Sequence, residues 1–487
     1  MSDARIVMPQ LILALGAVAV YVAGRLWPRR NSMLASLTAT LFAAALAASL
    51  ALSPARQAGA WPSWAPADAD LPMLQRDPAS ALLTTVALAL GLAVSVYSGK
   101  YLALDKRYEY YYPLVLLMSA GMLGMVMAVD LIALYLFTVM TSAASYVLVA
   151  FRRGTPTAIE AGFKLLIMSG MAATLALAGI GLVYRQTGSL ALPQPVSAMQ
   201  GWGALGAALL VYAYLVKAAI FPAHTWLPDA HGRAPSSISA ILSGSLVEFY
   251  LFVLIKVGLG LGIPMRWFGL LLTVLALCTM TVGNIMALRQ TYGKRLLAYS
   301  SIAQMGYMLL ALGVGLVSNR PEPIAAALFL VATHAAMKGL AFLCKGVFHF
   351  YAGAVLVDEL DGLAARMPVV ASCFVVALAA LAGLPPLGGF RAKLEILQGL
   401  FMASDALAIL TVAVFMVNSL ISLGYYLPLM GRVLRPAPPA EKTAVSAWMV
   451  APLAALAAVV VFLGVMPGPL MLAARAAARF IITWGPH

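Results

Sequence analysis

Long apolar runs follow one another along most of this 487-residue chain, and they limit what it can fold into. A helix needs roughly 20 apolar residues to cross the ~30 Å hydrocarbon core of a bilayer. Runs of that kind begin near Met8, Met33, Ser80, Pro113, Leu131, Gly162, Gly203, Ser236, Met265, Tyr299, Pro323, Met367, Ala406 and Ala447. Hydrophobic residues make up 63% of the chain and charged residues 10%, which excludes an ordinary soluble domain. The sequence therefore predicts an all-α polytopic membrane protein with about fourteen transmembrane helices.

The loops between these runs differ in their basic residues. One set of alternate loops is rich in Lys and Arg, including Arg29, Arg152 and Lys294, whereas the other set holds few. Short cytoplasmic loops collect basic residues, so we expect a multi-pass protein of a bacterial-type inner membrane with both termini on the outer side. The same rule explains the formal net charge of +14, which therefore does not predict nucleic-acid binding.

Between Tyr214 and Glu248, two apolar runs each hold one ionisable side chain, Lys217 in the first and Glu248 in the second. A charge at the bilayer centre costs about 2.5–3.5 kcal/mol on insertion scales, so such residues are functional candidates. Pro222 follows Lys217 by five positions, and it predicts a helix break just past the lysine. Broken helices mark the ion site in transporters. The alternative is that Lys217 ends its helix and extends its amine to the membrane interface.

A second apolar run is interrupted by a Pro-Pro and a Gly-Gly pair just before Lys393. Pro222 and Pro385 hold corresponding places in two five-span blocks, which is the pattern of an internally repeated transporter. An odd number of spans makes the repeats inverted. The expected division is three N-terminal helices with an outer loop (1–111), a first inverted repeat (112–260), a second inverted repeat (261–430), and a C-terminal helix with a tail (431–487).

His334 and Lys338 lie four positions apart between the two breaks, so they share one helix face. A single histidine in a membrane helix is usually a packing residue. Two titratable groups on one face favour a proton relay instead. Further along the chain, residues 470–484 alternate small and apolar residues with Arg475 and Arg479. This segment is either an amphipathic surface helix or a frayed tail.

Four stretches carry a resemblance to a known family. They are Lys217-x4-Pro222-x-His224-x-Trp226-Leu-Pro-Asp229-Ala-His231, the run from Ser239 to Gly244, His334-x3-Lys338, and the run from Ala382 to Lys393. In these stretches the chain resembles the antiporter-like subunits shared by complex I (NADH:quinone oxidoreductase), Mrp cation/proton antiporters and energy-converting membrane hydrogenases or formate hydrogenlyases. The resemblance extends from Tyr112 to Tyr426.

The resemblance implies two inverted five-helix repeats, each with a broken helix, and a central polar axis for protons or sodium ions. It implies that Lys217 exchanges protons in one half-channel and that Lys393 stands at the outer exit. His334 and Lys338 would continue the axis between them. The cytoplasmic access loop would hold His224, Asp229 and His231.

The chain departs from the family at two positions. The family has a glutamate in the fifth helix, where this chain has Val139, and a lysine in the eighth helix, where this chain has Glu248. Our hypothesis is that Glu248 replaces the missing acid as the partner of Lys217. Lys256 is a second candidate partner for Glu248, although extension of its amine to the outer interface suits it better. The competing hypothesis is a first half-channel that no longer conducts.

The sequence contains no glycine-rich phosphate loop, carboxylate cluster or Cys-x-x-Cys pair, and we expect no cofactor and no metal. Cys278, Cys344 and Cys373 are expected to be small core residues. We therefore expect an ion-translocating subunit without a catalytic site of its own, with protons favoured over sodium. Its partners would be other membrane subunits of a translocase of the NADH:quinone oxidoreductase or membrane hydrogenase type. The alternatives are a subunit of a cation/proton antiporter, an inorganic-carbon transporter, and a non-pumping structural paralogue.

Overall fold

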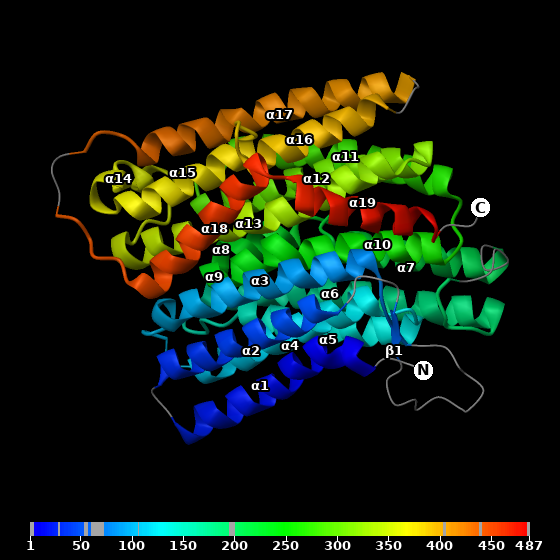
Figure 1. Cartoon of the computed structure of the whole chain (residues 1–487), viewed down its shortest axis with the longest axis horizontal. Helices are drawn as coiled ribbons and strands as arrows, with labels where there is room; N and C mark the ends of the chain where they lie inside the picture. The colour runs from blue at the N-terminus through cyan, green and yellow to red at the C-terminus, as the bar shows by residue number, and fades with distance from the viewer. Residues whose placement is uncertain are drawn as a thin grey trace.

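The computed structural model describes residues 4–27, 30–52, 57–59, 73–105, 107–193, 200–402, 406–437 and 441–484. In these residues most helices run side by side along one direction (Figure 1). Twelve of them are long and apolar enough to cross a membrane. Two further predicted spans form the shorter apolar helices α7 (Gly201–Lys217) and α15 (Pro368–Ala382). The all-α membrane fold is confirmed, while the number of spans remains a prediction.

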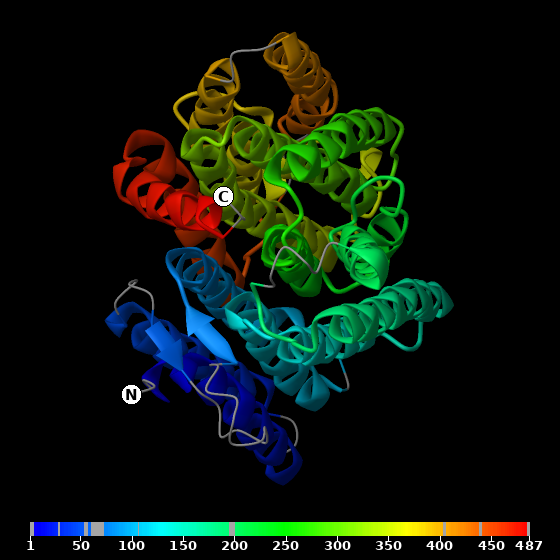
Figure 2. The same ribbon diagram turned by 90° about the vertical axis from the view of Figure 1, so that its right-hand side faces the viewer.

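The N-terminal part lies at one side of the bundle when the helices are viewed end-on, as Figure 2 shows in blue. It comprises η1 (Ala4–Val7), α1 (Met8–Leu26), α2 (Asn31–Ala51), the antiparallel strands β1 (Gln57–Gly59) and β2 (Leu74–Arg76), and α3 (Pro78–Tyr101). Helix α3 begins where Asp77 caps it, because its carboxylate accepts the backbone N–H of Ser80 at 2.7 Å. Most of the outer loop expected after Ala60 lies outside the described residues.

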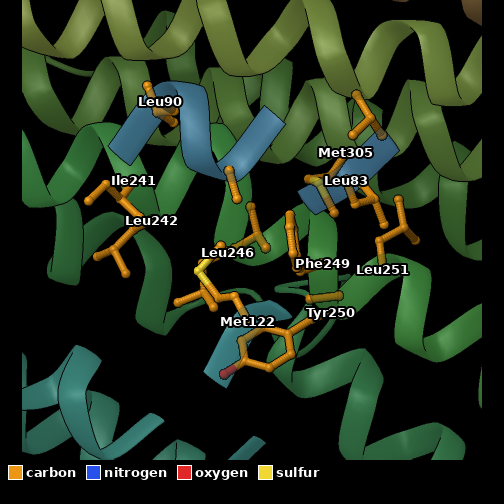
Figure 3. Packing of buried hydrophobic residues seen from close by; sticks show 14 of the residues in the cluster. Leu83, Leu90, Met122, Ile241, Leu242, Leu246, Phe249, Tyr250, Leu251 and Met305 are labelled. Atoms are coloured by element: carbon orange, nitrogen blue, oxygen red, sulfur yellow. The ribbon is translucent and has the colours of Figure 1, made fainter. Parts of the chain in front are cut away.

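The middle of the chain forms the helices that surround Lys217 and Glu248. They are α4 (Tyr108–Met127), α5 (Leu131–Val149), α6 (Pro156–Thr187), α7, α8 (Trp226–Arg233), α9 (Ser236–Ile241), the π-helical turn η3 (Leu242–Leu246) and α10 (Val247–Gly260). The last three form one continuous span, Ser236–Gly260, whose apolar window is entirely buried. Figure 3 shows part of its packing: Leu246, Phe249 and Leu251 lie among side chains that include Leu83 and Met305. Polar groups on this span must therefore find partners inside the protein.

The C-terminal half adds α11 (Met265–Leu288), α12 (Gly293–Ser318), α13 (Pro321–Ala352), η4 (Asp358–Leu360), α14 (Leu363–Arg366), α15, α16 (Gly388–Phe401), α17 (Ala406–Val433), α18 (Ala447–Val465) and α19 (Gly468–Ile482). Helix α13 is buried throughout its apolar window and contacts helices of both halves, including α3, α12 and α16. Small residues let α11 and α12 approach closely. A Cβ atom on Gly283 would lie 2.6 Å from the backbone nitrogen of Ala303.

Helix α19 differs from both expectations for the C-terminal segment. It is a helix, so the frayed tail is wrong, and it contacts α3 and α13 along the bundle instead of lying across the membrane surface. Figure 1 shows it continuing the path of α18 beyond the turn at Pro467. Of the cysteines, Cys344 and Cys373 are buried as expected, whereas Cys278 is exposed because its side of α11 faces outward.

Candidate ion-translocation site

Lys217 is the last residue of α7, and the chain does not resume a helix until Trp226. The predicted break just past the lysine is confirmed, and Ala219 takes a left-handed backbone conformation within it (φ 53°). Lys217 is only 4% exposed, so the alternative of an amine at the membrane interface is wrong. Its Nζ donates hydrogen bonds to Ser142 Oγ at 2.6 Å and to Ser169 Oγ at 2.5 Å.

Hydroxyl groups surround the amine of Lys217, and no carboxylate among the described residues contacts it. Ser142 Oγ lies 3.1 Å from the hydroxyl of Tyr250, and the Tyr250 ring lies 5.7 Å from Lys217 Nζ. Thr138, one turn before Ser142, contacts the hydroxyl of Tyr214 at 3.3 Å. Ser142 and Ser169 were not among the residues predicted from the sequence. The spacing of Thr138, Ser142 and Ser145, which share one face of α5, could have indicated a polar helix face there.

Glu248 pairs with His334 and not with Lys217, so the predicted Lys217–Glu248 ion pair is wrong. Glu248 Oε1 and His334 Nδ1 are within hydrogen-bond distance, and both side chains are fully buried. Within the described residues, Glu248 Oε2 and His334 Nε2 have no hydrogen-bond partner. The contact joins α10 to α13, one turn of helix before Lys338. An acid and an imidazole in contact can hold one shared proton and exchange it at their remaining polar atoms.

Lys338 extends this buried centre toward α12. Its Nζ donates to the carbonyl of Leu297 at 2.8 Å and to the hydroxyl of Ser300. One helix turn beyond Lys338, Phe342 stacks on the ring of His231, with centroids 4.9 Å apart. His231 is fully buried, and neither ring nitrogen has a partner among the described residues. The predicted face of α13 therefore reaches His231. His231 and Asp229 lie in helix α8, so the access segment is not the loop that was expected.

The other residues of that segment have different surroundings. The ring of His224 stacks on Phe221, with centroids 5.7 Å apart. Asp229 is partly exposed and forms ion pairs with Lys164 at 3.1 Å and Arg295 at 3.7 Å. These pairs hold α8 against α6 and α12. Lys164 also forms an ion pair with Glu160, at 2.8 Å.

Lys393 reaches back across the second break. Helix α15 ends at Ala382, and Lys393 Nζ on α16 donates to the Ala382 carbonyl at 2.9 Å. The last carbonyls of a helix lack intrahelical partners and attract cations. Gly383 makes this turn possible because its φ is +88° and a Cβ there would lie 2.9 Å from Lys393 Cδ. Lys217 thus lies at the carboxyl end of one broken helix, and the amine of Lys393 lies beside the carboxyl end of the other.

A polar network that was not predicted from the sequence lies beside Lys393. Its amine lies 5.4 Å from the centre of the Tyr307 ring, and the Tyr307 hydroxyl accepts from Asn284 at 3.1 Å. Asn284 also donates to Asn418 at 3.0 Å and accepts from Tyr425 at 2.8 Å. Asn284 and Asn418, two amides within apolar runs, could have indicated this network.

The site thus consists of three buried clusters. They are the Lys217 cluster with its serines, the central cluster of Glu248, His334 and Lys338, and the Lys393 cluster with its amides. Within the described residues, no hydrogen bond or ion pair joins the charged group of one cluster directly to that of another. The bundle consists of membrane-length helices whose ionisable groups point inward, and the chain breaks after α7 and after α15, each time beside a buried lysine. This arrangement defines an antiporter-like membrane subunit.

Comparison with known proteins agrees with this class. A family model described as NADH:quinone oxidoreductase/Mrp antiporter, transmembrane, matches residues 128–422, and the chain belongs to this family. It is 32% identical over 432 residues to F(420)H(2) dehydrogenase subunit N of Methanosarcina mazei, covering 84% of this chain and 85% of that protein. It is 33% identical over 416 residues to NADH-quinone oxidoreductase subunit N of Desulforudis audaxviator, covering 80% and 81%.

Solved structures share the fold over almost the whole chain. A chain of the Mrp complex from a Dietzia species has a TM-score of 0.86 at 22% identity, covering 99% of this chain and 98% of that one. A chain of respiratory complex I from Thermus thermophilus has a TM-score of 0.78 at 28% identity, covering 96% and 99%. These relatives and neighbours are subunits of multisubunit membrane complexes, and the predicted family resemblance is confirmed.

Proposed function

We propose that this chain carries protons across the membrane as a subunit of a larger complex whose other subunits supply the energy. The observation that carries the proposal is the burial of ionisable groups inside the bundle, each with a partner in the protein, at Lys217, Glu248, His334, Lys338 and Lys393. Groups of this kind inside a membrane protein mark ion and proton pathways. The names of the relatives, which are dehydrogenase and oxidoreductase subunits, favour a redox reaction as the source of energy.

The chemistry of the clusters favours protons over sodium ions. Sodium is a hard cation, and hard cations are bound by several oxygen ligands, whereas the amines of Lys217, Lys338 and Lys393 take up and release protons. The carboxylate of Glu248 is engaged with the imidazole of His334. A set of three amines and one acid–imidazole pair is suited to proton transfer.

Two side chains share a helix with residues of the central cluster and lie beside one of the other two clusters. Tyr250 lies two residues after Glu248 on α10, and its ring lies over Lys217. On the other side, Gln304 lies one turn after Ser300 on α12 and donates to Leu381 at 3.2 Å, next to the carbonyl that Lys393 contacts. The proposed order is therefore Lys217, then the central cluster, then Lys393.

The direction of the path follows from the loops. Figure 1 has both termini at one end of the bundle, and the loops rich in Lys and Arg lie at the other. The positive-inside rule makes the second end cytoplasmic, in a bacterial-type inner membrane. His224, Asp229 and His231 would then form the cytoplasmic access region, and the outer exit would lie near Lys393.

The two broken helices also support an internal repeat. The break between α7 and α8 belongs to the proposed first repeat (112–260), and the break between α15 and α16 belongs to the second (261–430). In each block the fourth of five membrane passes is interrupted. The segments 1–111 and 431–487 would flank these repeats, with α3 and α19 in contact beside α13.

The proposal is tested by neutralising the central lysine in the native complex. Lys338→Gln should abolish proton uptake into sealed vesicles while the complex still assembles, because the central cluster loses its amine. Lys442→Gln, which alters an exposed loop lysine, is the matched control and should pump normally. Normal pumping after Lys338 and Lys393 are both changed to Gln would instead support a structural paralogue.

A second candidate is a subunit whose first half-channel no longer conducts. It is favoured by the contacts of Lys217, whose amine is bound by two serine hydroxyls and by no carboxylate in the described part of the chain. A comparison of Lys217→Ala with Lys393→Ala separates the two candidates. An inactive first half predicts a transport defect in the second variant and none in the first.

A further inference from the structure

A cavity of about 250 Å³ opens at the end of the bundle opposite the two termini. It lies between the start of α6, the end of α8, the start of α12 and the end of α13. Of the described residues that line it, five are basic and none is acidic. The five basic residues are Arg152, Arg233, Lys294, Lys345 and His349. The proposed proton path uses none of these residues.

Neighbouring protein groups compensate little of this charge. The amine of Lys294 donates to the carbonyl of Ala234, and the amine of Lys345 donates to the carbonyl of Ala354 at 2.5 Å. These neutral oxygens satisfy one of the three donors that each ammonium carries. The guanidinium of Arg233 lies 5.9 Å from the centre of the Tyr292 ring. The cavity therefore gathers positive groups that retain unused donors.

Among the described residues, two acids lie near the cavity, and one of them already pairs with a basic residue of the lining. Asp105 binds Arg152 at 3.1 Å. Glu359 is exposed, and its carboxylate accepts the backbone N–H groups of Val355 at 2.6 Å and Leu356 at 2.8 Å. Two carboxylates do not balance four Lys and Arg side chains, so the cavity keeps an excess of positive charge.

The local fold adds to this excess. Helix α12 begins at Gly293 beside the cavity, and the amino end of a helix carries partial positive charge. Basic groups a few ångströms apart repel one another and repel an approaching cation. The cavity is thus a poor access route for protons or sodium ions, and it is suited to an anion.

The position of the cavity indicates which anion. Basic pockets between membrane helices on the cytoplasmic side bind the headgroups of anionic lipids. The volume lies a little below the roughly 300–1,000 Å³ of pockets for drug-sized ligands, which suits a headgroup. Tyr292 and Val355 line the cavity and are also among the exposed large hydrophobic residues, so the cavity opens at the surface of the bundle.

We propose that this cavity binds the phosphate group of an anionic phospholipid. The phosphate oxygens would accept hydrogen bonds from Arg233, Lys294 and Lys345, and the acyl chains would leave past Tyr292. Such a lipid would hold the ends of α8, α12 and α13 together, close to His231 of α8. Lipid binding does not depend on the proposed proton transport, because it concerns other residues and is measured without turnover.

The test is lipid binding to the purified, delipidated full chain or its native complex, followed by native mass spectrometry. The probes are phosphatidylglycerol and cardiolipin, with phosphatidylcholine as the neutral lipid and inorganic phosphate as the free anion. We expect the anionic lipids to bind best. Arg233→Gln combined with Lys294→Gln should weaken their binding roughly tenfold or more, because two basic groups are removed. Arg366→Gln combined with Lys442→Gln, at exposed positions of the same end outside the cavity, should leave binding unchanged.

Thermal unfolding without lipid checks that both double variants fold like the unaltered protein. If the cavity variant misfolds, the single change Arg233→Gln on the cavity rim replaces it. Equal lipid binding by cavity and control variants would overturn the proposal. Competition by inorganic phosphate as effective as that by the lipids would overturn the lipid assignment in favour of free phosphate. Absence of binding by every phosphate probe would also overturn it and would point to an acidic side chain of a partner subunit.

Discussion

Glu248 and His334 contact each other in the interior of the bundle, through one carboxylate oxygen and one ring nitrogen. Glu248 belongs to α10 and His334 to α13, so the contact crosses from the first half of the chain to the second. In this chain an acid–imidazole pair therefore occupies the middle of the buried polar groups, with Lys338 one turn further along α13.

Substitution at Glu248 should separate the structural role of this pair from its role in transport. Glu248→Ala leaves a buried imidazole without its partner, and breaking a buried pair costs about 3–5 kcal/mol, so we expect a clear fall in unfolding temperature. Glu248→Gln keeps a hydrogen-bonding group of the same shape and should fold well, yet it cannot take up a proton. Vesicle assays of proton uptake check this, and full uptake by the Gln variant would rule out Glu248 as a proton carrier.

The serines around Lys217 should be required for its position. Hydrogen bonds to a charged group contribute about 1.5–3 kcal/mol each, so Ser142→Ala and Ser169→Ala together should release the Lys217 amine and slow transport. Thr174→Ala on the same helix as Ser169 is the control, since Thr174 is exposed and bonds only to the carbonyl of Gly170 among the described contacts. Transport is measured in vesicles holding the whole complex. An unaltered rate in the double serine variant would favour the inactive first half-channel.

Gly383→Ala should affect Lys393 beyond its effect on the backbone. A left-handed conformation costs a non-glycine residue roughly 1–2 kcal/mol, and the new Cβ would also displace the Lys393 side chain. Gly353→Ala at the end of α13 is a matched control, because φ there is +69° and nothing lies within 4 Å of the new Cβ. Both variants should lower thermal stability to a similar extent. Only the first should lower the transport rate, and equal rates would contradict a role for the Lys393 position.

The loop after α13 should loosen in acid. Hydrogen bonds from the backbone N–H groups of Leu356 and Val355 hold the pKa of Glu359 below its usual range. A lowered pKa in the folded state means that this contribution is present above the ordinary carboxyl pKa and is lost as pH falls through the lowered one. Protection of these two amides from hydrogen exchange, corrected for intrinsic rates, should therefore fall with pH. Glu359→Gln should show low protection throughout, and pH-independent protection in the unaltered chain would contradict the prediction.

Much of the fold follows from local chemistry in the sequence. The length and hydropathy of each run predict where a helix crosses the membrane, and Pro222 and Pro385 lie in the two breaks. The cost of a charge in lipid also explains why Lys217, His334, Lys338 and Lys393 could be selected as candidates before any contact was known. These features depend on a residue and its close neighbours along the chain, and the structure has them where the sequence predicts them.

The partners of the candidate residues could not be predicted in the same way. Lys256 was expected to extend its amine to the outer interface, but it is 3% exposed, donates to the carbonyl of Val126 at 2.8 Å and lies 5.0 Å from the centre of the Trp484 ring. The reason is that α19 continues along the bundle beyond α18, so that Trp484, just after the end of α19, covers the amine. Glu248 likewise meets His334 because α13 packs against α9 and η3, which lead directly into α10. Lys217 instead meets serines of α5 and α6.

The sequence by itself thus determined the class of fold, the two helix breaks and the buried candidates for ion transfer, because these depend on hydropathy and local backbone chemistry. Only the tertiary structure decided which candidates touch, which amine is covered by the C-terminal helix and where the basic side chains enclose a cavity. Such relationships depend on the rotation and packing of helices that are distant along the chain, and apolar helices of similar composition leave those choices open.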